Sequence, residues 1–289
     1  MPRLVGAVMI GAVVILLGAF AYAALAYGPF SLRAQYNGDV ALLLGRSTPQ
    51  PIVTDASLAD LPSPISRYLK GAGVVGQPRI RNMFARMHGR FRATADGQWM
   101  PFTAEQYNGF ECCRGASRFF YMTASRARVP VHAFHRYTDG RATMRVKVAG
   151  LATVIEAAGA EMTRGETVTL FNDLCVLAPA ALLDAAVVWE QIEPLRVTAA
   201  YTNAGVTVRA DLVFDENGRL VDFVSDDRLQ TVEDGATLLP SRWSTPLRGL
   251  KTFGHVQLAA GGEARWHSDA DSFAYIEVEF DEVKYNVVR

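Results

Sequence analysis

The sequence predicts an α+β fold: a large curved antiparallel sheet shaped as a half-open barrel, with a few short helices, preceded by one N-terminal transmembrane helix. Three observations predict it. Residues 4–27 are apolar and uncharged, the chain beyond residue 80 alternates apolar and polar residues with the period of strands, and helical spacing recurs in only two places beyond residue 60. Because strand candidates follow one another closely, an antiparallel sheet is favoured over βαβ units.

Residues 1–28 are predicted to be a membrane anchor. Leu4–Tyr27 carries no charge; at about 1.5 Å per residue it reaches roughly 36 Å, enough to cross a hydrocarbon core of about 30 Å. Two Ala-x-Ala triplets, at 21–23 and 24–26, resemble signal-peptide cleavage sites. The apolar run is longer than the roughly 7–15 residues of a secretory signal, so we favour an uncleaved anchor over a signal peptide.

Flanking charges predict the orientation of this anchor. Arg3 and the free amine precede it, whereas Arg33 after it is partly offset by Asp39. Since positive charge stays preferentially on the cytoplasmic side, we expect a single-pass protein of the cell (inner) membrane, with the bulk of the chain extracytoplasmic or periplasmic.

The rest of the chain is predicted to be a linker with a possible short helix, 29–60, and an extracytoplasmic β-rich domain, 61–289. The linker prediction rests on the Pro, Ser and Thr content of that segment. The domain begins with LPSPISRYLKGAG, which predicts a helix with Pro64 in its first turn and Gly71 near its end.

The segment MFARMHGRFRA predicts a half-buried strand with a basic outer face, because its apolar side chains alternate with Arg86, His88, Arg90 and Arg92. Asp96–Gly97 then predicts a two-residue hairpin turn. That turn sets two pairs opposite each other, Phe91 with Phe102 and His88 with Glu105. Pro101 cannot donate to a ladder, so the second strand is predicted to be an edge or bulged strand.

Eleven further segments are strand candidates, and one helical segment interrupts them. The strand candidates are 118–124, 131–138, 142–149, 151–157, 195–202, 205–215, 219–229, 241–248, 252–259, 262–268 and 272–281. In residues 166–186 the apolar positions recur at three and four, and Pro179 divides the run into two short helices.

The stretch LVFDENGRLVDFVSDDR predicts two strands joined by a turn. If Glu-Asn-Gly is a three-residue loop with Gly218 left-handed, Asp215 faces Arg219; if Asn-Gly is a two-residue turn, Arg209 faces Asp226. Strict alternation places Asp226 and Arg228 on one face and Asp227 on the other. This excludes an acid dyad formed by the two adjacent carboxylates.

No catalytic motif is present, and we expect neither a cofactor nor a metal. The sequence lacks a Gly-x-Ser-x-Gly elbow, a dinucleotide-binding loop, a Walker loop and His-Glu-x-x-His. His132 and His135 would lie on opposite faces of a strand. Cys112, Cys113 and Cys175 lack zinc-site spacing; they are either buried free thiols or include one bridge to Cys175. No catalytic residue is assigned, and a binding role is favoured over an enzyme.

Charge is distributed unevenly along the chain, although its net value is zero. Residues 67–147 hold 15 Lys/Arg and 4 Asp/Glu, whereas residues 148–289 hold 11 and 22. Arg86, Arg90 and Arg92 could therefore form a membrane-surface basic face that meets anionic lipid head groups. The alternative is that they pair with the acidic C-terminal strands. We expect no nucleic-acid partner.

A cavity in the curved sheet could hold a lipid-like or other apolar ligand. The candidate ligand-binding residues are Met83, Met87, Trp99, Phe102, Trp189, Asp227, Arg228 and Trp243. The alternative is that the tryptophans and methionines are ordinary core.

Several segments together resemble a bacterial family known only as a domain of unknown function. They are LPSPISRYLKGAG, GRFRATADGQWMPFTAEQ, LAPAALL followed by VVWEQIE, and FDENGRLVDFVSDDR. The resemblance covers most of 61–289 and implies a hydrophobic N-terminus before the domain, but no activity. The predicted architecture is also similar to the half-open barrels of periplasmic lipoprotein and lipid carriers, a likeness of fold alone.

These observations predict a membrane-anchored envelope protein whose partners are membrane lipids and a lipid-like ligand. One alternative is an envelope lipid or glycan hydrolase that uses Asp227 or Glu105 as acid or base. The other is a scaffold that binds a protein through an edge strand.

Overall fold

A computed structural model describes the chain except for residues 1, 46–48, 112–114, 127–128, 232–237 and 269–270. The helices are α1 (Pro2–Tyr27), α2 (Leu32–Leu43), α3 (Ser63–Gly71) and α4 (Ala160–Val176), with short 3₁₀ helices η1 (Asp55–Leu58) and η2 (Pro179–Leu183). The strands are β1 (Asn82–Phe91), β2 (Met100–Glu111), β3 (Gly115–Arg126), β4 (Val129–Thr138), β5 (Arg141–Val148), β6 (Ala152–Ala158), β7 (Val187–Glu193), β8 (Arg196–Asn203), β9 (Val206–Phe214), β10 (Leu220–Thr231), β11 (Leu238–Ser244), β12 (Leu247–Arg248), β13 (Lys251–Phe253), β14 (Val256–Leu258), β15 (Gly261–His267) and β16 (Ser272–Tyr285).

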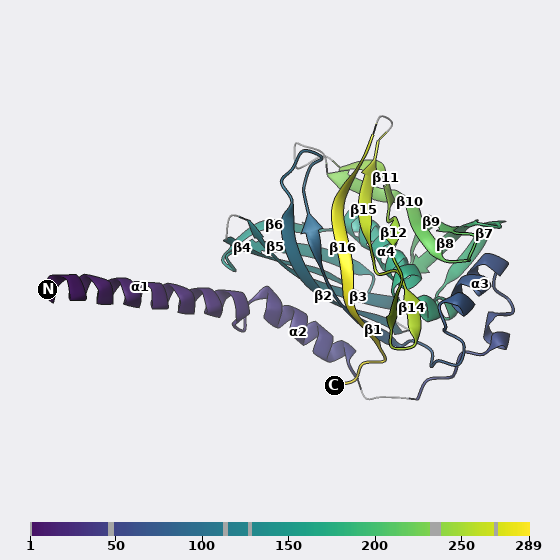
Figure 1. Ribbon diagram of the computed structural model, residues 1–289, viewed down its shortest axis with the longest axis horizontal. Coiled ribbons are helices and arrows are strands. Elements are labelled where there is room, and N and C mark those ends of the chain that lie inside the picture. The colour runs from purple at the N-terminus through teal and green to yellow at the C-terminus, as the bar shows by residue number, and fades with distance from the viewer. Residues whose placement is uncertain (1, 46–48, 112–114, 127–128, 232–237, 269–270) are drawn as a thin grey trace.

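One large antiparallel sheet forms the body of the protein and curls into a half-barrel (Figure 1). Its strand order is β6-β5-β4-β3-β2-β1-β16-β15-β11-β10-β9-β8-β7, and β12 pairs with β15. The β1 to β6 meander and the C-terminal strands meet where β1 pairs with β16. The predicted α+β half-barrel is confirmed.

Helix α4 connects the two edges of the sheet, because the chain leaves β6 at one edge and re-enters at β7 on the other. It lies inside the curl (Figure 1), and Leu170, Phe171 and Leu174 are at most 1 % exposed. We call the side of the sheet that carries α4 the concave face. The predicted helical pair is confirmed, but α4 begins at Ala160, six residues before the expected start.

Helix α2 packs on the opposite, convex face. Leu32, Tyr36 and Val40 form a second apolar cluster with Phe119, Tyr121 and Phe134 of β3 and β4. Ser31 caps the helix by accepting a hydrogen bond from the Ala34 amide at 3.0 Å. The segment expected to be a linker therefore contains a helix that is packed against the sheet.

Helix α1 extends away from the half-barrel as a long apolar rod (Figure 1). Its exposed side chains include Ile10, Ile15 and Phe20, each at least 67 % exposed. Within the described residues, the stretch Met9–Leu43, which includes most of α1, is the one helical segment long and apolar enough to cross a membrane.

The hairpin between β1 and β2 differs from the prediction. Gly89 pairs with Phe102 and Phe91 pairs with Met100, a register two residues away from that of a turn at Asp96–Gly97. The connection spans residues 92–99, so it is longer than the expected two-residue turn. The two rings still lie near each other, with the centroids of Phe91 and Phe102 6.2 Å apart.

Strand β2 is internal, which corrects the edge-strand prediction. It pairs with β1 on one side and β3 on the other. Pro101 is tolerated because it lies at the start of the strand, beyond the last residue that pairs with β3.

Two other strand predictions also change. The predicted strand 252–259 is a small separate hairpin, β13 and β14, and 241–248 is divided into β11 and β12. Strand β7 was not predicted, because VVWEQIE does not alternate cleanly. Cys175 is a buried free thiol; Cys112 and Cys113, its possible disulfide partners, lie outside the described residues.

Candidate functional site

The concave face carries an apolar area at one end of the sheet. We call the end of the sheet that carries the β1–β2, β3–β4 and β5–β6 connections the rim, and the apolar area lies between α4 and this rim. Strand alternation and cross-strand pairing place the side chains of β1, β3, β4 and β15 on the concave face, and Tyr275 joins them by stacking on Trp266 and accepting a hydrogen bond from Trp243. They are half-buried and pack on the main core: Phe91, Phe120, Met122, Val131, Trp266 and Tyr275. At the β6 edge Ile155, paired with Val146, is 46 % exposed. We call this area the apolar wall.

Four predicted ligand-binding residues lie beneath this surface. Met83, Met87, Phe102 and Trp243 are 0, 6, 5 and 3 % exposed and belong to the core that includes α4 and η2. They therefore support the apolar wall from below. Their positions agree with the alternative given in the sequence analysis, namely that such side chains are part of the core.

The two remaining predicted tryptophans are not among these fully buried residues, although Trp189 packs on the same core. Trp99 lies in the β1–β2 connection, with the guanidinium carbons of Arg90 and Arg92 4.6 and 4.7 Å from its ring centroid. Trp189 is half-buried on β7, the edge strand at the opposite side of the sheet from β6.

Arg228 points into the concave side. Its guanidinium carbon lies 4.5 Å from the ring centroid of Trp243 and 5.5 Å from that of Trp266, and Nη1 donates to Thr169 Oγ1 of α4 at 3.0 Å. Its Nε is buried without a hydrogen-bond partner among the described residues. Arg228 marks the boundary between α4 and the apolar wall.

Asp227 also faces α4 and pairs with Arg164, while its second oxygen accepts from the Arg209 amide at 2.6 Å. The prediction that Asp226 and Arg228 share a face is wrong. A β-bulge lies between Ser225 and Arg228, where the β10–β11 register shifts by one residue.

A buried ionic network joins α4 to β2 and β3. Arg118 Nε donates to Asp173 at 2.8 Å and its Nη1 to Glu166 at 3.0 Å, and Gln106 and Asn108 donate to the same Asp173 oxygen. Burial by itself raises the pKa of Glu166, but the charges of Arg118 and His135 outweigh it and lower that pKa to about 2. The network fixes α4 on the concave face.

The histidines of β4 lie on opposite faces, as predicted. His135 Nδ1 lies 3.0 Å from Glu166 on the concave side, whereas His132 lies on the convex side between Tyr22 and Tyr121. Within the described part of the chain no group of three His, Cys, Asp or Glu side chains could hold a metal.

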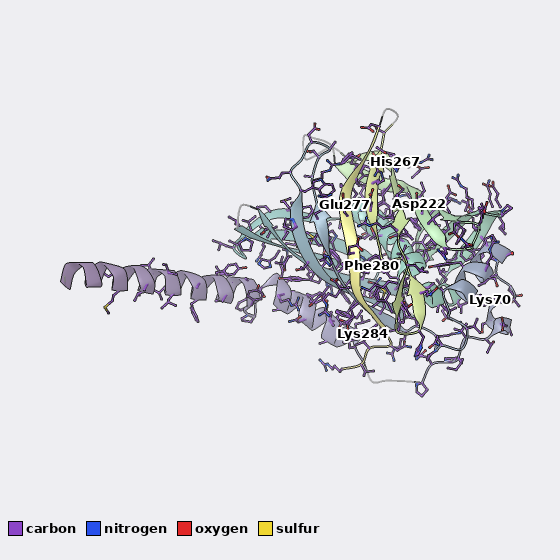
Figure 2. All side chains as sticks on the ribbon, in the orientation of Figure 1. Lys70, Asp222, His267, Glu277, Phe280 and Lys284 are labelled. Carbon is purple, nitrogen blue, oxygen red and sulfur yellow. The ribbon has the colours of Figure 1, made fainter. Side chains whose placement is uncertain are left out.

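The basic face of β1 is paired with β16. Arg86 pairs with Glu282 at 2.7 Å and Arg90 with Glu277 at 2.8 Å; Figure 2 labels Glu277 on β16. Arg92 Nε donates to the Ala274 carbonyl at 2.8 Å. These contacts favour the second explanation of the charge asymmetry, pairing within the protein.

Glu105 is on the convex face, where Arg33 of α2 binds it at 2.7 Å. It lies beside a cavity of about 360 Å³ between α2 and the sheet, lined in part by Tyr36 and Tyr107. The two carboxylates of the hydrolase alternative, Asp227 and Glu105, thus lie on opposite faces of the sheet.

The residues of the apolar wall were not among the predicted site residues, although a signal for some was present. Phe120 and Met122 alternate with the convex Phe119 and Tyr121 along β3. Because this strand is apolar on both faces, alternation alone did not show which face carries the site. The contacts of α2 and α4 decide that question.

A model of a family of unknown function, DUF6544, matches residues 51–278. A DUF1329 family protein from Desulfovibrio piger has a similar structure, with 9 % identity, a TM-score of 0.43, and coverage of 82 % of this chain and 95 % of that chain. A LolA superfamily protein from Nitrosomonas europaea has 10 % identity, a TM-score of 0.37, and coverage of 77 % and 93 %. Such low TM-scores transfer no ligand or activity to this chain. No curated protein sequence matches it.

Proposed function

This chain belongs to the family of unknown function DUF6544, and we propose that it is a membrane-anchored envelope protein that binds a lipid-like ligand on the apolar wall. The observation that carries the proposal is the row of half-buried apolar side chains between α4 and the rim. Contiguous apolar surface that stays open to solvent is characteristic of binding sites.

The chemistry of the apolar wall fits an acyl chain or a similar ligand. Phe91, Met122 and Val131 offer aromatic and flexible aliphatic contacts, and methionine adapts to ligands of different shape. Covering this surface would remove apolar area from water at about 25 cal/mol per Å². The sheet supplies the wall and α4 supplies its floor, so a bound chain would lie between α4 and the rim.

The position of α1 supports a membrane source for the ligand. The last two turns of α1 contact β4 and the β5–β6 turn: the Tyr22 hydroxyl is 3.1 Å from His132 Nε2, and Gly150 lies against Ala26. That turn is part of the rim. If α1 spans the bilayer, the rim of the half-barrel lies beside the membrane surface.

Ligand retention tests the proposal. The full chain, purified in mild detergent, is extracted with organic solvent, and its lipids are quantified by mass spectrometry. Met122→Asp places a charge on the apolar wall and should reduce the retained lipid. Ser125→Asp is the control, because Ser125 is exposed on the same strand but points to the convex side.

The proposal fails if the wild-type chain retains no lipid beyond the amount that detergent micelles carry. It also fails if Met122→Asp and Ser125→Asp retain equal amounts. The melting temperature of both variants is measured in parallel, so that loss of lipid through unfolding is recognised.

A further inference from the structure

The end of α1 is fixed to one corner of the half-barrel. The Tyr22 hydroxyl lies 3.1 Å from His132 Nε2, and His132 Nδ1 lies 2.9 Å from the Tyr121 hydroxyl. His132 is 2 % exposed, and burial lowers its pKa. This chain of contacts holds α1 against β4.

A second contact lies beside it, where the β5–β6 turn meets the last turn of α1. Gly150 has φ +70°, and a Cβ there would come within 2.9 Å of the Ala26 nitrogen. Only glycine permits both this backbone conformation and this close approach. The β5–β6 turn therefore lies level with the last turn of α1.

Three exposed apolar side chains belong to the segments that meet or border this contact. Leu151 directly follows Gly150 and is 67 % exposed, Val129 at the start of β4 is 42 % exposed, and Phe30 just after α1 is 89 % exposed. The Ala149 amide donates to the Pro130 carbonyl at 2.8 Å, which ties the β4 start to the β5–β6 turn. We call these three residues the apolar corner.

We infer that the apolar corner is a membrane contact that seats the half-barrel on the bilayer. The inference rests on the anchoring part of the proposed function, namely that α1 spans the membrane. A helix of 26 residues is about 39 Å long at 1.5 Å per residue and exceeds a hydrocarbon core of about 30 Å. Its last two turns, with Tyr22 and Tyr27, then lie in the interface, where tyrosine is enriched.

A bilayer is the occupant that this geometry selects. The apolar corner is level with the last turn of α1, so a membrane that surrounds α1 meets Leu151 without any movement of the domain. The apolar corner thus takes the role that the sequence suggested for Arg86, Arg90 and Arg92. Those arginines are instead engaged with β16.

Photo-crosslinking in nanodiscs of phosphatidylcholine and phosphatidylglycerol tests the inference on the full chain. A photoreactive phenylalanine analogue replaces Leu151, Val188 or Ile15, one position at a time. Val188 of β7 is the matched control, since it is 65 % exposed but lies at the other sheet edge. Ile15, 73 % exposed in α1, reports insertion of the helix.

We expect lipid adducts, detected by peptide mass spectrometry, at Leu151 and Ile15 and none at Val188. Adducts at Ile15 without adducts at Leu151 overturn the membrane contact and leave the anchor intact. Absence of adducts at Ile15 overturns both the anchor and the contact. Equal adducts at Leu151 and Val188 show unspecific lipid contact and also overturn it. Ligand binding on the apolar wall is measured separately, by retained lipid.

Discussion

Asp226 and Arg228 are two residues apart on β10 and lie on opposite faces of the sheet. Asp226 binds Arg242 on the outside through two hydrogen bonds of 2.8 and 2.9 Å. Arg228 lies over Trp243 on the inside. The β-bulge between Ser225 and Arg228 inserts one extra residue and so reverses the side to which the following residues point.

This reversal predicts different costs for the two carboxylates. Asp227→Asn should lower the free energy of unfolding by about 1 kcal/mol or more, because it weakens a charge-assisted bond to Arg164 and the bond from the Arg209 amide. Asp226→Asn should stay within about 0.5 kcal/mol, since its ion pair is exposed. Chemical denaturation of the full chain in detergent measures both. Equal, negligible losses would contradict the assigned positions.

The pH dependence of stability should contain a contribution from Asp222. Burial raises the pKa of this carboxyl to about 6, against the partial opposition of bonds from the Phe223 and Thr245 amides. Because the folded pKa lies above the unfolded one, the folded state binds more protons between about pH 4 and pH 6, and the contribution of Asp222 is lost as pH rises through that window.

Asp222→Asn removes this titration. The difference in unfolding free energy between this variant and the wild type should therefore shift in favour of the variant from about pH 4 to about pH 6. Asp226→Asn, on the same strand, serves as the control: Arg242 lowers the pKa of Asp226, so any shift for this variant across that window should be small and of the opposite sign. A difference for Asp222→Asn that does not change with pH contradicts the raised pKa.

The basic strand should behave as a structural element. Changing Arg86, Arg90 and Arg92 together to Gln should lower the melting temperature, because it removes contacts with β16. Arg90→Glu combined with Glu277→Arg should recover part of the loss that Arg90→Glu causes alone. The triple variant could instead keep its melting temperature and retain less phosphatidylglycerol in mixed micelles. That outcome would contradict a structural role and support the alternative that the strand faces lipid.

Gly150 should be intolerant of a side chain for two separable reasons. Gly150→Ala should destabilise the full chain by about 1 kcal/mol through its left-handed backbone, and further through the clash with Ala26. Gly205→Ala is a matched control, since Gly205 has φ +84° and nothing within 4 Å of the position of its Cβ. Thermal unfolding compares them. Equal losses would mean that the contact with α1 contributes nothing.

Local chemistry determined a large part of this fold. The uncharged run of residues 4–27 predicted α1, and period-two alternation predicted most strands. The tripeptide Glu-Asn-Gly limited the connection to two alternatives, a three-residue loop or a two-residue turn. The structure contains the three-residue loop, with Gly218 at φ +79° and the Gly218 amide donating to Asp215. These features depend on a few adjacent residues, so sequence patterns contain them.

Registers and bulges needed the tertiary structure. The pairing of β1 with β2 differs by two residues from the one expected at Asp96–Gly97, because contacts along both neighbouring strands outweigh the preference of one turn. The bulge before Arg228 likewise appears only in the pairing of β10 with β11, and alternation along residues 225–228 did not predict it.

The sequence by itself determined that an apolar N-terminal helix precedes a strand-rich, half-open antiparallel sheet, because hydrophobicity and alternation act over a few residues. Only the tertiary structure decided which face became the candidate site. Strand β3 is apolar on both sides, and its faces differ because α2 buries Phe119 and Tyr121, whereas Met122 on the face that carries α4 stays half-buried. The packing of α2 and α4 on the sheet brings together segments that are distant in the chain, so no local sequence pattern predicts it.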